Sequence, residues 1–336
     1  MSEINSHTLA AFAGYLRDDR ALLSCTSGGV ATALASAVIR AGGHVAGVVY
    51  EEDFYSAHYE IVSDQAGLER LKGSKYVQPH MGSVYADVKA LLEDDQMVLF
   101  IGLPCAVAAV KHFLGREYEK LITLELACHG PTTEAVHRQY VQHLEKTFGS
   151  KITDFSVRKK KNTWTPAYLY ARFADGREFW EEFYRTQYGY GFSMLLPNSC
   201  YHCKFRGDNR VADLLIGDFW GASQADPFWN AKGVSAILVH TQKGLDFLQS
   251  VPELALFETT AQRITQKNKS ILQTPAAHPQ KDRFAQLLNE KGLLYAVKHT
   301  KPASQRVRDF LKGLMPRKFV AYLRKNVKHK LRKSGK

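Results

Sequence analysis

The sequence predicts an α/β protein with a mixed, largely parallel sheet in layers with flanking helices, an α+β C-terminal part and a basic helical tail. Apolar runs of strand type alternate with helical patterns over residues 20–145, which is typical of layered α/β structure. The pattern changes near residue 151, and residues 301–336 are strongly basic. We therefore expect an α/β domain at 1–150, a second domain at 151–300 and a tail at 301–336.

The first half shows the alternation most clearly. Small and branched apolar residues at 30–41 follow Gly28-Gly29 and predict a buried helix. The continuous apolar run at 97–102 is typical of a strand buried on both faces of a parallel sheet. On the same grounds we expect further helices at 84–92 and 106–113, and further strands at 44–50 and 121–127.

The second half contains shorter strands. Strands are predicted at 152–155, 168–173 and 235–240, with a helix at 243–249. Asp175-Gly176 between two apolar stretches predicts a hairpin. The four basic residues at 158–161 are more typical of a solvated face than of a binding site.

Composition favours a globular, intracellular protein. The chain has 336 residues, 45% of them hydrophobic and 11% aromatic, which is enough for a sizeable core. No stretch approaches the roughly 20 apolar residues of a spanning helix. The N-terminus lacks the basic and apolar regions of a secretory signal. We therefore expect a cytoplasmic protein, in a compartment where paired cysteines more often bind metal than form disulfides.

The positive charge belongs to the tail. Residues 301–336 carry a net charge of +12, which equals the +12 of the whole chain, so residues 1–300 are neutral overall. Phe319, Leu323, Val327 and Leu331 recur every four positions among Lys and Arg. A basic amphipathic helix of this kind predicts attachment to an anionic membrane surface. A nucleic acid or acidic partner, or a solvated tail, is the alternative.

Four of the five cysteines lie in loop-like positions. Cys105 and Cys128 each follow a predicted strand, and Cys200 and Cys203 form a CxxC pair. Open α/β sheets bind ligands beyond the carboxyl ends of their strands, so the first two can converge. Thiolates suit an iron–sulfur cluster or zinc. Small buried core cysteines are the alternative.

Two short motifs are compatible with phosphate binding. Ser27-Gly28-Gly29 precedes a predicted helix, whose N-terminal amides can bind an anion. In the second motif, Ser74 precedes Lys75, which offers a positive charge, and Tyr76, which offers a stacking face. Ser-Gly-Gly is also an ordinary turn, and each motif alone is weak evidence. With the cysteines, they indicate a redox cofactor that contains a diphosphate.

These motifs together resemble the coenzyme F420 hydrogenase/dehydrogenase beta-subunit family. The resemblance covers about residues 20–295 and follows the family's order. It is carried by six ordered matches: 25–30 (Cys-Thr-Ser-Gly-Gly-Val), 73–78 (Gly-Ser-Lys-Tyr-Val-Gln), 102–105 (Gly-Leu-Pro-Cys), 128–131 (Cys-His-Gly-Pro), 200–205 (Cys-Tyr-His-Cys-Lys-Phe), and 212–213 with 217–221 (Ala-Asp, Gly-Asp-Phe-Trp-Gly). The segment Asn268-Lys269-Ser270, with Pro279 and Arg283-Phe284, also fits the family.

The resemblance implies a flavin-dependent iron–sulfur oxidoreductase. Its cofactors would be FAD and one 4Fe–4S cluster, with electrons passing to or from an organic substrate or carrier. The implied cluster ligands are Cys105, Cys128, Cys200 and Cys203. The implied flavin contacts are Ser27, Gly28, Gly29, Ser74, Lys75 and Tyr76, with Asp218 and Trp220 beside the flavin or the cluster. Related stand-alone bacterial proteins often accompany surface-polysaccharide assembly, which would suit a peripheral position at the inner face of a membrane, held there by the tail.

The chain departs from the family pattern in three ways. It lacks the N-terminal ferredoxin-like cysteine run, so an external donor such as ferredoxin or a reduced carrier is expected. Cys25 stands beside the Ser-Gly-Gly loop, where a bystander is the simpler interpretation. The tail matches no family feature. The competing hypotheses are a zinc-stabilised binding module that uses this tail, and a scaffold that has lost its flavin. The catalytic residues, the substrate and the oligomeric state are not predicted, and no specific nucleic acid is expected.

Overall fold

The computed structural model describes residues 8–207 and 210–302. The described residues divide into two units, with the boundary between Lys281 and Asp282. The described part of the second unit contains helix α11 (Lys281–Lys291), which begins at the boundary, and helix α12 (Leu293–Thr300). The amphipathic pattern predicted for the tail lies outside the described residues. The predicted boundary at residue 150 separates two domains of the family, and it stays a prediction.

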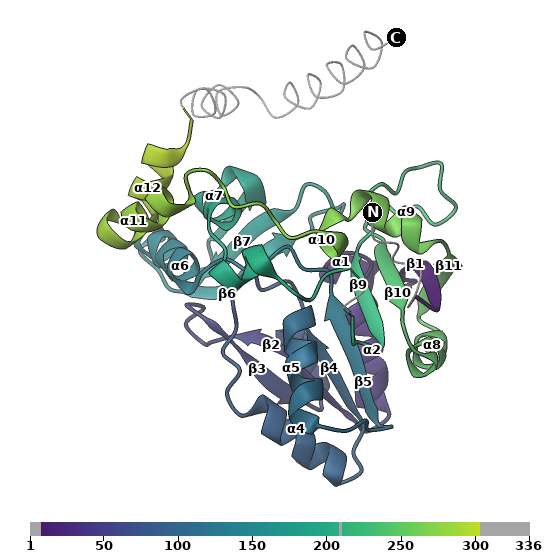
Figure 1. Ribbon diagram of the computed structural model, residues 1–336. Coiled ribbons are helices and arrows are strands. Elements are labelled where there is room, and N and C mark those ends of the chain that lie inside the picture. The colour runs from purple at the N-terminus through teal and green to yellow at the C-terminus, as the bar shows by residue number, and fades with distance from the viewer. Residues whose placement is uncertain (1–7, 208–209, 303–336) are drawn as a thin grey trace. The chain divides into compact units, whose positions relative to one another are not determined.

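An eight-stranded mixed sheet organises the first unit (Figure 1). The strand order is β11-β1-β10-β9-β5-β4-β2-β3. Parallel pairing joins β9, β5, β4 and β2, and the strands on both sides of this centre pair antiparallel. The strands are β1 (Ala10–Leu16), β2 (His44–Tyr50), β3 (Ala57–Val62), β4 (Val98–Gly102), β5 (Leu121–Leu126), β9 (Leu214–Asp218), β10 (Ser235–Val239) and β11 (Leu254–Glu258). The predicted mixed α/β sheet is therefore confirmed.

Helices cover both faces of this sheet because the central strands are apolar on both sides. Leu99 of β4 contributes to the core beneath α2, whereas its neighbours Val98 and Phe100 contribute to the core beneath α4 and α5. Figure 1 shows α5 lying over β4 and β5, with α2 on the opposite face. The helices that flank the sheet are α1 (Asp19–Ser24), α2 (Val30–Arg40), α3 (Gln65–Leu71), α4 (Val84–Glu93), α5 (Pro104–Leu114) and α8 (Gln242–Gln249).

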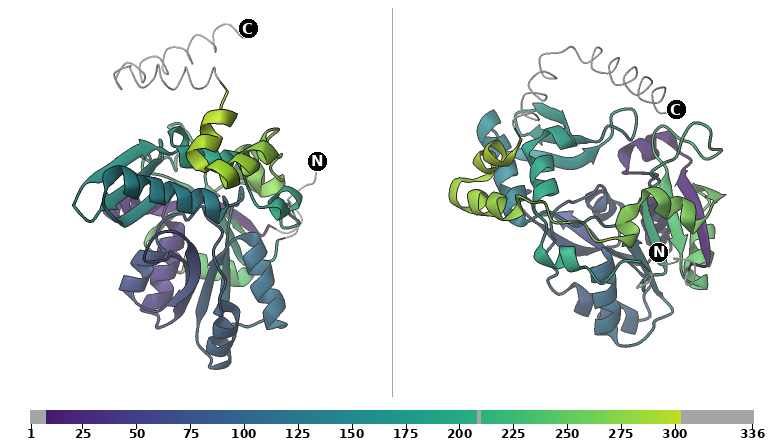
Figure 2. Two further views of the ribbon diagram at one scale, coloured as in Figure 1. Left: turned by 90° about the vertical axis from the view of Figure 1, so that its left-hand side faces the viewer. Right: turned by 45° about the horizontal axis from the view of Figure 1, so that its top comes forward.

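A smaller antiparallel sheet, β6-β7-β8, forms the α+β part. It comprises β6 (Ile152–Lys159), β7 (Tyr168–Phe173) and β8 (Glu178–Glu182), and the predicted hairpin turns at Gly176 with φ of 85°. The surrounding elements are α6 (Glu134–Phe148), η2 (Phe183–Arg185), α7 (Gln187–Met194), η3 (Asn198–His202), α9 (Ala261–Lys267) and α10 (Lys269–Leu272). Figures 1 and 2 place the small sheet on the side to which the carboxyl ends of β4 and β5 point.

Most predicted elements agree with the structure to within two residues. The helix expected at 106–113 begins earlier, at Pro104, because proline suits the first helical position and Leu103 is the N-cap. The strand expected at 152–155 extends to Lys159. That extension moves the start of the basic run from a solvated loop onto a strand.

Candidate functional site

Three neighbouring parallel strands bring candidate residues to one edge of the sheet. Strands β4, β5 and β9 lie side by side. Cys105 follows β4, Cys128 follows β5, and Asp218 is the last residue of β9. The carboxyl ends of such strands are where open α/β sheets bind ligands. The predicted proximity of Cys105 and Cys128 to neighbouring strand ends is confirmed.

The CxxC pair lies close to the same edge. Cys200 belongs to the 3-10 helix η3, and Cys203 follows it directly. A Cβ built on Gly130, two residues after Cys128, would lie 3.5 Å from Cys200 Cβ. The loop after β5 therefore packs against η3.

The four thiols influence one another electrostatically. Burial raises the pKa of the Cys128 thiol to about 12, and proximity to Cys105 and Cys200 adds to this rise. Burial and then Cys203 raise the pKa of Cys105, while burial, Cys105 and Cys203 raise that of Cys200. All five cysteines are free thiols. Among residues 8–207 and 210–302, no group of three or more His, Cys, Asp or Glu side chains is arranged to hold a metal ion. Ligation by the four cysteines stays a prediction.

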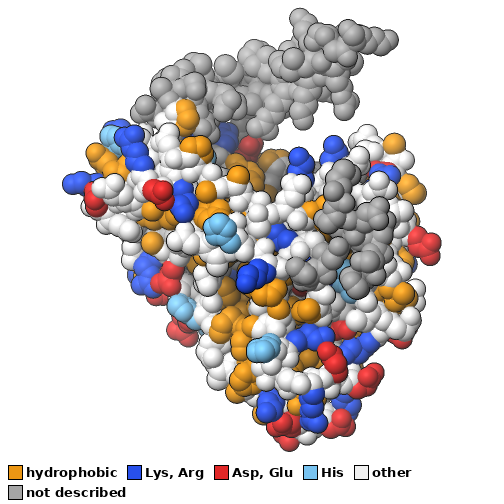
Figure 3. Space-filling model, in the orientation of Figure 1, with side chains coloured by type: hydrophobic (Ala, Val, Ile, Leu, Met, Phe, Trp, Pro, Cys, Tyr) orange, Lys and Arg blue, Asp and Glu red, His pale blue; other side chains and the backbone are white. Residues whose placement is uncertain are grey.

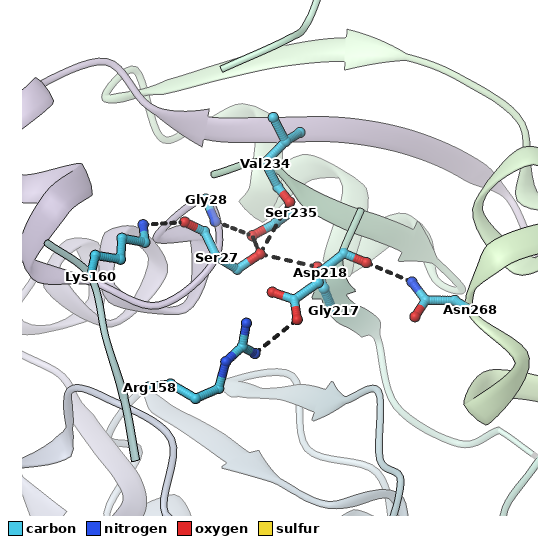
Figure 4. Close-up of polar contacts among 9 residues, drawn as sticks. All are labelled: Ser27, Gly28, Arg158, Lys160, Gly217, Asp218, Val234, Ser235 and Asn268. Atoms are coloured by element: carbon cyan, nitrogen blue, oxygen red, sulfur yellow. Dashed lines mark hydrogen bonds and ion pairs between the residues drawn. The ribbon is translucent and has the colours of Figure 1, made fainter. Parts of the chain in front are cut away.

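The Ser27-Gly28-Gly29 loop is tightly joined to β1 and β10 (Figure 4). Ser27 Oγ donates to the Val234 carbonyl at 3.1 Å, and the Gly28 amide donates to Ser235 Oγ at 3.0 Å. A Cβ on Gly28 would lie 2.2 Å from the Gly14 carbonyl oxygen, so only glycine fits there. Gly29, with φ of 75°, is the N-cap of α2. The Gly28 amide is therefore already hydrogen-bonded within the chain. The amides without a backbone partner are those in the first turn of α2.

An ion pair between Arg158 and Asp218 lies beside this loop. Arg158 Nη1 donates to Asp218 Oδ2 at 2.8 Å, and the two side chains are 14% and 8% exposed. The Tyr76 hydroxyl hydrogen-bonds to Arg158, and Asn268 donates to the Asp218 carbonyl at 2.6 Å. Ser27, Tyr76 and Asp218, from three separate sequence motifs, are thus brought together.

One acceptor in this cluster has no partner. Asp218 Oδ1 is buried and makes no hydrogen bond among the described residues. A buried carboxylate oxygen without a donor is costly, since most buried polar groups are hydrogen-bonded. The oxygen is therefore available to accept a further hydrogen bond.

Lys160 is a residue that the sequence interpretation missed. It is only 8% exposed, and its Nζ donates to the carbonyls of Leu22 at 2.8 Å and Ser27 at 2.5 Å. Burial lowers its pKa to about 8. The interpretation of 158–161 as a solvated face was wrong for Arg158 and Lys160, because β6 carries them into the junction with the large sheet. The buried alternation of Phe155 and Val157 was the available signal.

The remaining predicted flavin contacts, Ser74, Lys75 and Trp220, have other surroundings. Lys75 Nζ donates to the carbonyls of Arg70, Leu71 and Lys72 at 2.7 to 2.8 Å, at the end of α3, and burial lowers its pKa to about 7. Ser74 is half-buried in the same segment. Trp220 is 43% exposed and contacts Trp164, with ring centroids 4.9 Å apart.

A depression of about 480 Å³ opens beside Trp220. Its lining includes Trp220, Gly221, Thr260, Gln266 and Lys267. The depression adjoins the end of β9 that carries Asp218. Lys267 lines it, and the next residue, Asn268, donates to the Asp218 carbonyl. Figure 3 shows acidic and basic side chains interspersed on the described part of one face of the molecule, which agrees with the neutral charge of residues 1–300.

The fold defines a mixed α/β protein whose candidate residues gather at one edge of the large sheet. Residues 95–263 match the family described as the C-terminal part of the beta subunit of coenzyme F420 hydrogenase/dehydrogenase. The match covers half of the chain, and the chain belongs to this family. It is therefore related to the beta subunits of redox enzymes, and the resemblance inferred from the motifs is confirmed.

A solved structure has the same overall fold. It is a chain of the F420-reducing NiFe hydrogenase complex from Methanosarcina barkeri, studied by xenon derivatization. The similarity has a TM-score of 0.54 at 14% sequence identity, and it covers 89% of this chain and 94% of that one. The comparison with curated proteins gave no match. Within the described ranges, none of the helices has the length and apolarity needed to cross a bilayer.

Proposed function

We propose that the protein is a flavin-dependent iron–sulfur oxidoreductase. Membership of a redox family supports the oxidoreductase class. The observation that carries the finer proposal is that Cys105 and Cys128 follow the adjacent parallel strands β4 and β5, and that the loop after Cys128 packs against the CxxC segment at Cys200. Four thiolates are the usual complement of a 4Fe–4S cluster.

In this proposal Cys105, Cys128, Cys200 and Cys203 hold the cluster. Cys105 lies in the first turn of α5, where the helix dipole favours a thiolate. The other three ligands come from two loops that pack together. The chemistry of the donor set fits the cluster, because cysteine thiolates are the ligands that iron–sulfur clusters take.

FAD is the second proposed cofactor, and the cluster around Asp218 supports it. The unpartnered Asp218 Oδ1 offers an acceptor, and Arg158 holds the carboxylate in place. Ser27, Gly28 and Gly29 would shape the loop before α2, whose first turn favours a phosphate. Ser74, Lys75 and Tyr76, with Trp220, complete the proposed contact set. Within this set, Lys75 would support the position of Tyr76 from the end of α3.

Flavin supplies the exchange between one-electron and two-electron chemistry. The chain's own residues would position both cofactors and exclude water, and no catalytic acid or base is assigned. The structural neighbour belongs to an F420-reducing complex. For this chain the substrate class is an organic substrate or carrier, with a proposed link to surface-polysaccharide biosynthesis. An external donor such as ferredoxin or a reduced carrier would deliver the electrons.

Attachment to an anionic membrane surface through residues 301–336 is a separate proposal. It rests on the net charge of +12 in this segment and on its apolar residues at every fourth position. The protein would then be peripheral at the inner face of the membrane. Truncation after residue 300 should release the protein from anionic liposomes and leave its visible spectrum unchanged. Undiminished liposome binding by the truncated chain would refute this role.

The test of the redox proposal is anaerobic purification with iron, sulfide, zinc and flavin measured on one sample. We expect about four iron, four sulfide and one FAD per chain. Cys203→Ser should abolish the cluster's absorbance and leave much of the flavin bound. Zinc without flavin would instead favour a metal-stabilised binding module.

A further inference from the structure

Arg206 connects the two loops that carry three of the candidate cluster ligands. It lies three residues after Cys203, and its Nη2 donates to the His129 carbonyl at 3.2 Å. Its Nη1 donates to the Ser270 carbonyl in α10. Because His129 follows Cys128, this one guanidinium joins the CxxC segment to the loop after β5.

The third nitrogen of Arg206 is unused. Nε is buried and has no hydrogen-bond partner among the described residues. The guanidinium also interacts electrostatically with the Cys128 and Cys200 thiols. A buried N–H donor is normally satisfied, since leaving it unpaired costs about 1–3 kcal/mol.

We propose that Arg206 holds these loops together and donates its Nε–H to a sulfur of the cluster, which raises the cluster's reduction potential. This inference rests on the proposed iron–sulfur function. Reduction adds negative charge to the cluster, so a nearby positive charge and a hydrogen bond stabilise the reduced form more than the oxidised form. Arg206 is thus a positioning residue that also sets the potential.

The experiment is an EPR-monitored redox titration of the full-length, cluster-loaded protein. Arg206→Met removes both the charge and the donors, and we expect the equilibrium constant for reduction to fall about tenfold, or ~59 mV for one electron. Arg206→Lys keeps the charge and loses the planar donor set, so its potential should fall by less. Lys269→Gln removes an exposed positive charge close to Ser270 and should leave the potential unchanged.

The outcomes separate this inference from the proposed function. A wild-type protein without iron and sulfide overturns both. A wild-type cluster whose potential is the same in Arg206→Met overturns the inference alone. If Arg206→Met fails to fold or to retain the cluster, the Arg206→Lys protein decides, because an unchanged potential there equally overturns the role of the planar donor.

Discussion

The ion pair between Arg158 and Asp218 gives a quantitative prediction. Both side chains are mostly buried, and the nitrogen and oxygen lie 2.8 Å apart. Asp218→Leu leaves the guanidinium buried without its counter-charge, which typically costs 3–5 kcal/mol. We expect about 3 kcal/mol, because Arg158 is still 14% exposed and keeps its bond to Tyr76. Arg158→Leu should cost a similar amount, since it leaves the Asp218 carboxylate buried without its counter-charge.

The assay is equilibrium urea unfolding of the cofactor-free protein, with m-values compared to exclude a change in cooperativity. The double variant should be destabilised by much less than the sum of the single variants, because no charge is left unpaired. The matched control is the ion pair of Arg40 with Glu253, which has a similar 2.7 Å separation but is 53% and 42% exposed. Its loss should cost less than about 1 kcal/mol. Strict additivity at Arg158 and Asp218 would refute the reasoning.

Three further predictions concern neighbouring parts of the fold. Burial lowers the pKa of His137 from 6.5 to about 4, so the unfolded chain takes up the proton first as the pH falls. Stability should therefore drop by about 3 kcal/mol between pH 6.5 and 4, and urea unfolding of His137→Gln should lack this component. Gly28→Ala forces a methyl against the Gly14 carbonyl and should cost about 3 kcal/mol, whereas Gly42→Ala, with no atom within 4 Å, should cost only the ~1 kcal/mol of its left-handed backbone. Lys75→Met should destabilise the cofactor-free protein by about 2 kcal/mol, because three carbonyls lose a charged donor. Urea unfolding measures this loss, and an unchanged free energy of unfolding in Lys75→Met would contradict a structural role for the three bonds.

The regular elements could be predicted wherever local pattern decides them. The strand at 168–173 was predicted with the same bounds as β7, because turn signals flank an apolar run. Strand β1 was not predicted, since Ala10–Leu16 is stabilised by antiparallel pairing with β10 and β11, more than 200 residues away. Its small apolar residues carry no strand signal without those partners.

The candidate site was predictable in its residue types and less so in its contacts. The cysteine positions follow from strand ends, which a sequence reveals. The environment of Arg158 does not, because its partner Asp218 lies 60 residues further along the chain. Lys160 contacts a carbonyl 133 residues away. The local run of charged residues predicts a solvent-exposed surface. The fold instead places two of them, Arg158 and Lys160, at a buried junction.

The site depends on both halves of the sequence at the level of single contacts. Strand β9 pairs with β5, so the second half supplies the third of the parallel strand ends at which the candidate residues meet. Strand β6 then brings Arg158 to the end of β9 and Lys160 to the loop before α2. Because Lys160 fixes the Ser27 carbonyl while Arg158 fixes Asp218, the two basic residues set the spacing between the loop and the unpartnered Asp218 oxygen. The geometry of this junction is therefore determined by β6 and the residue that follows it, in a segment whose composition alone indicates only a charged surface.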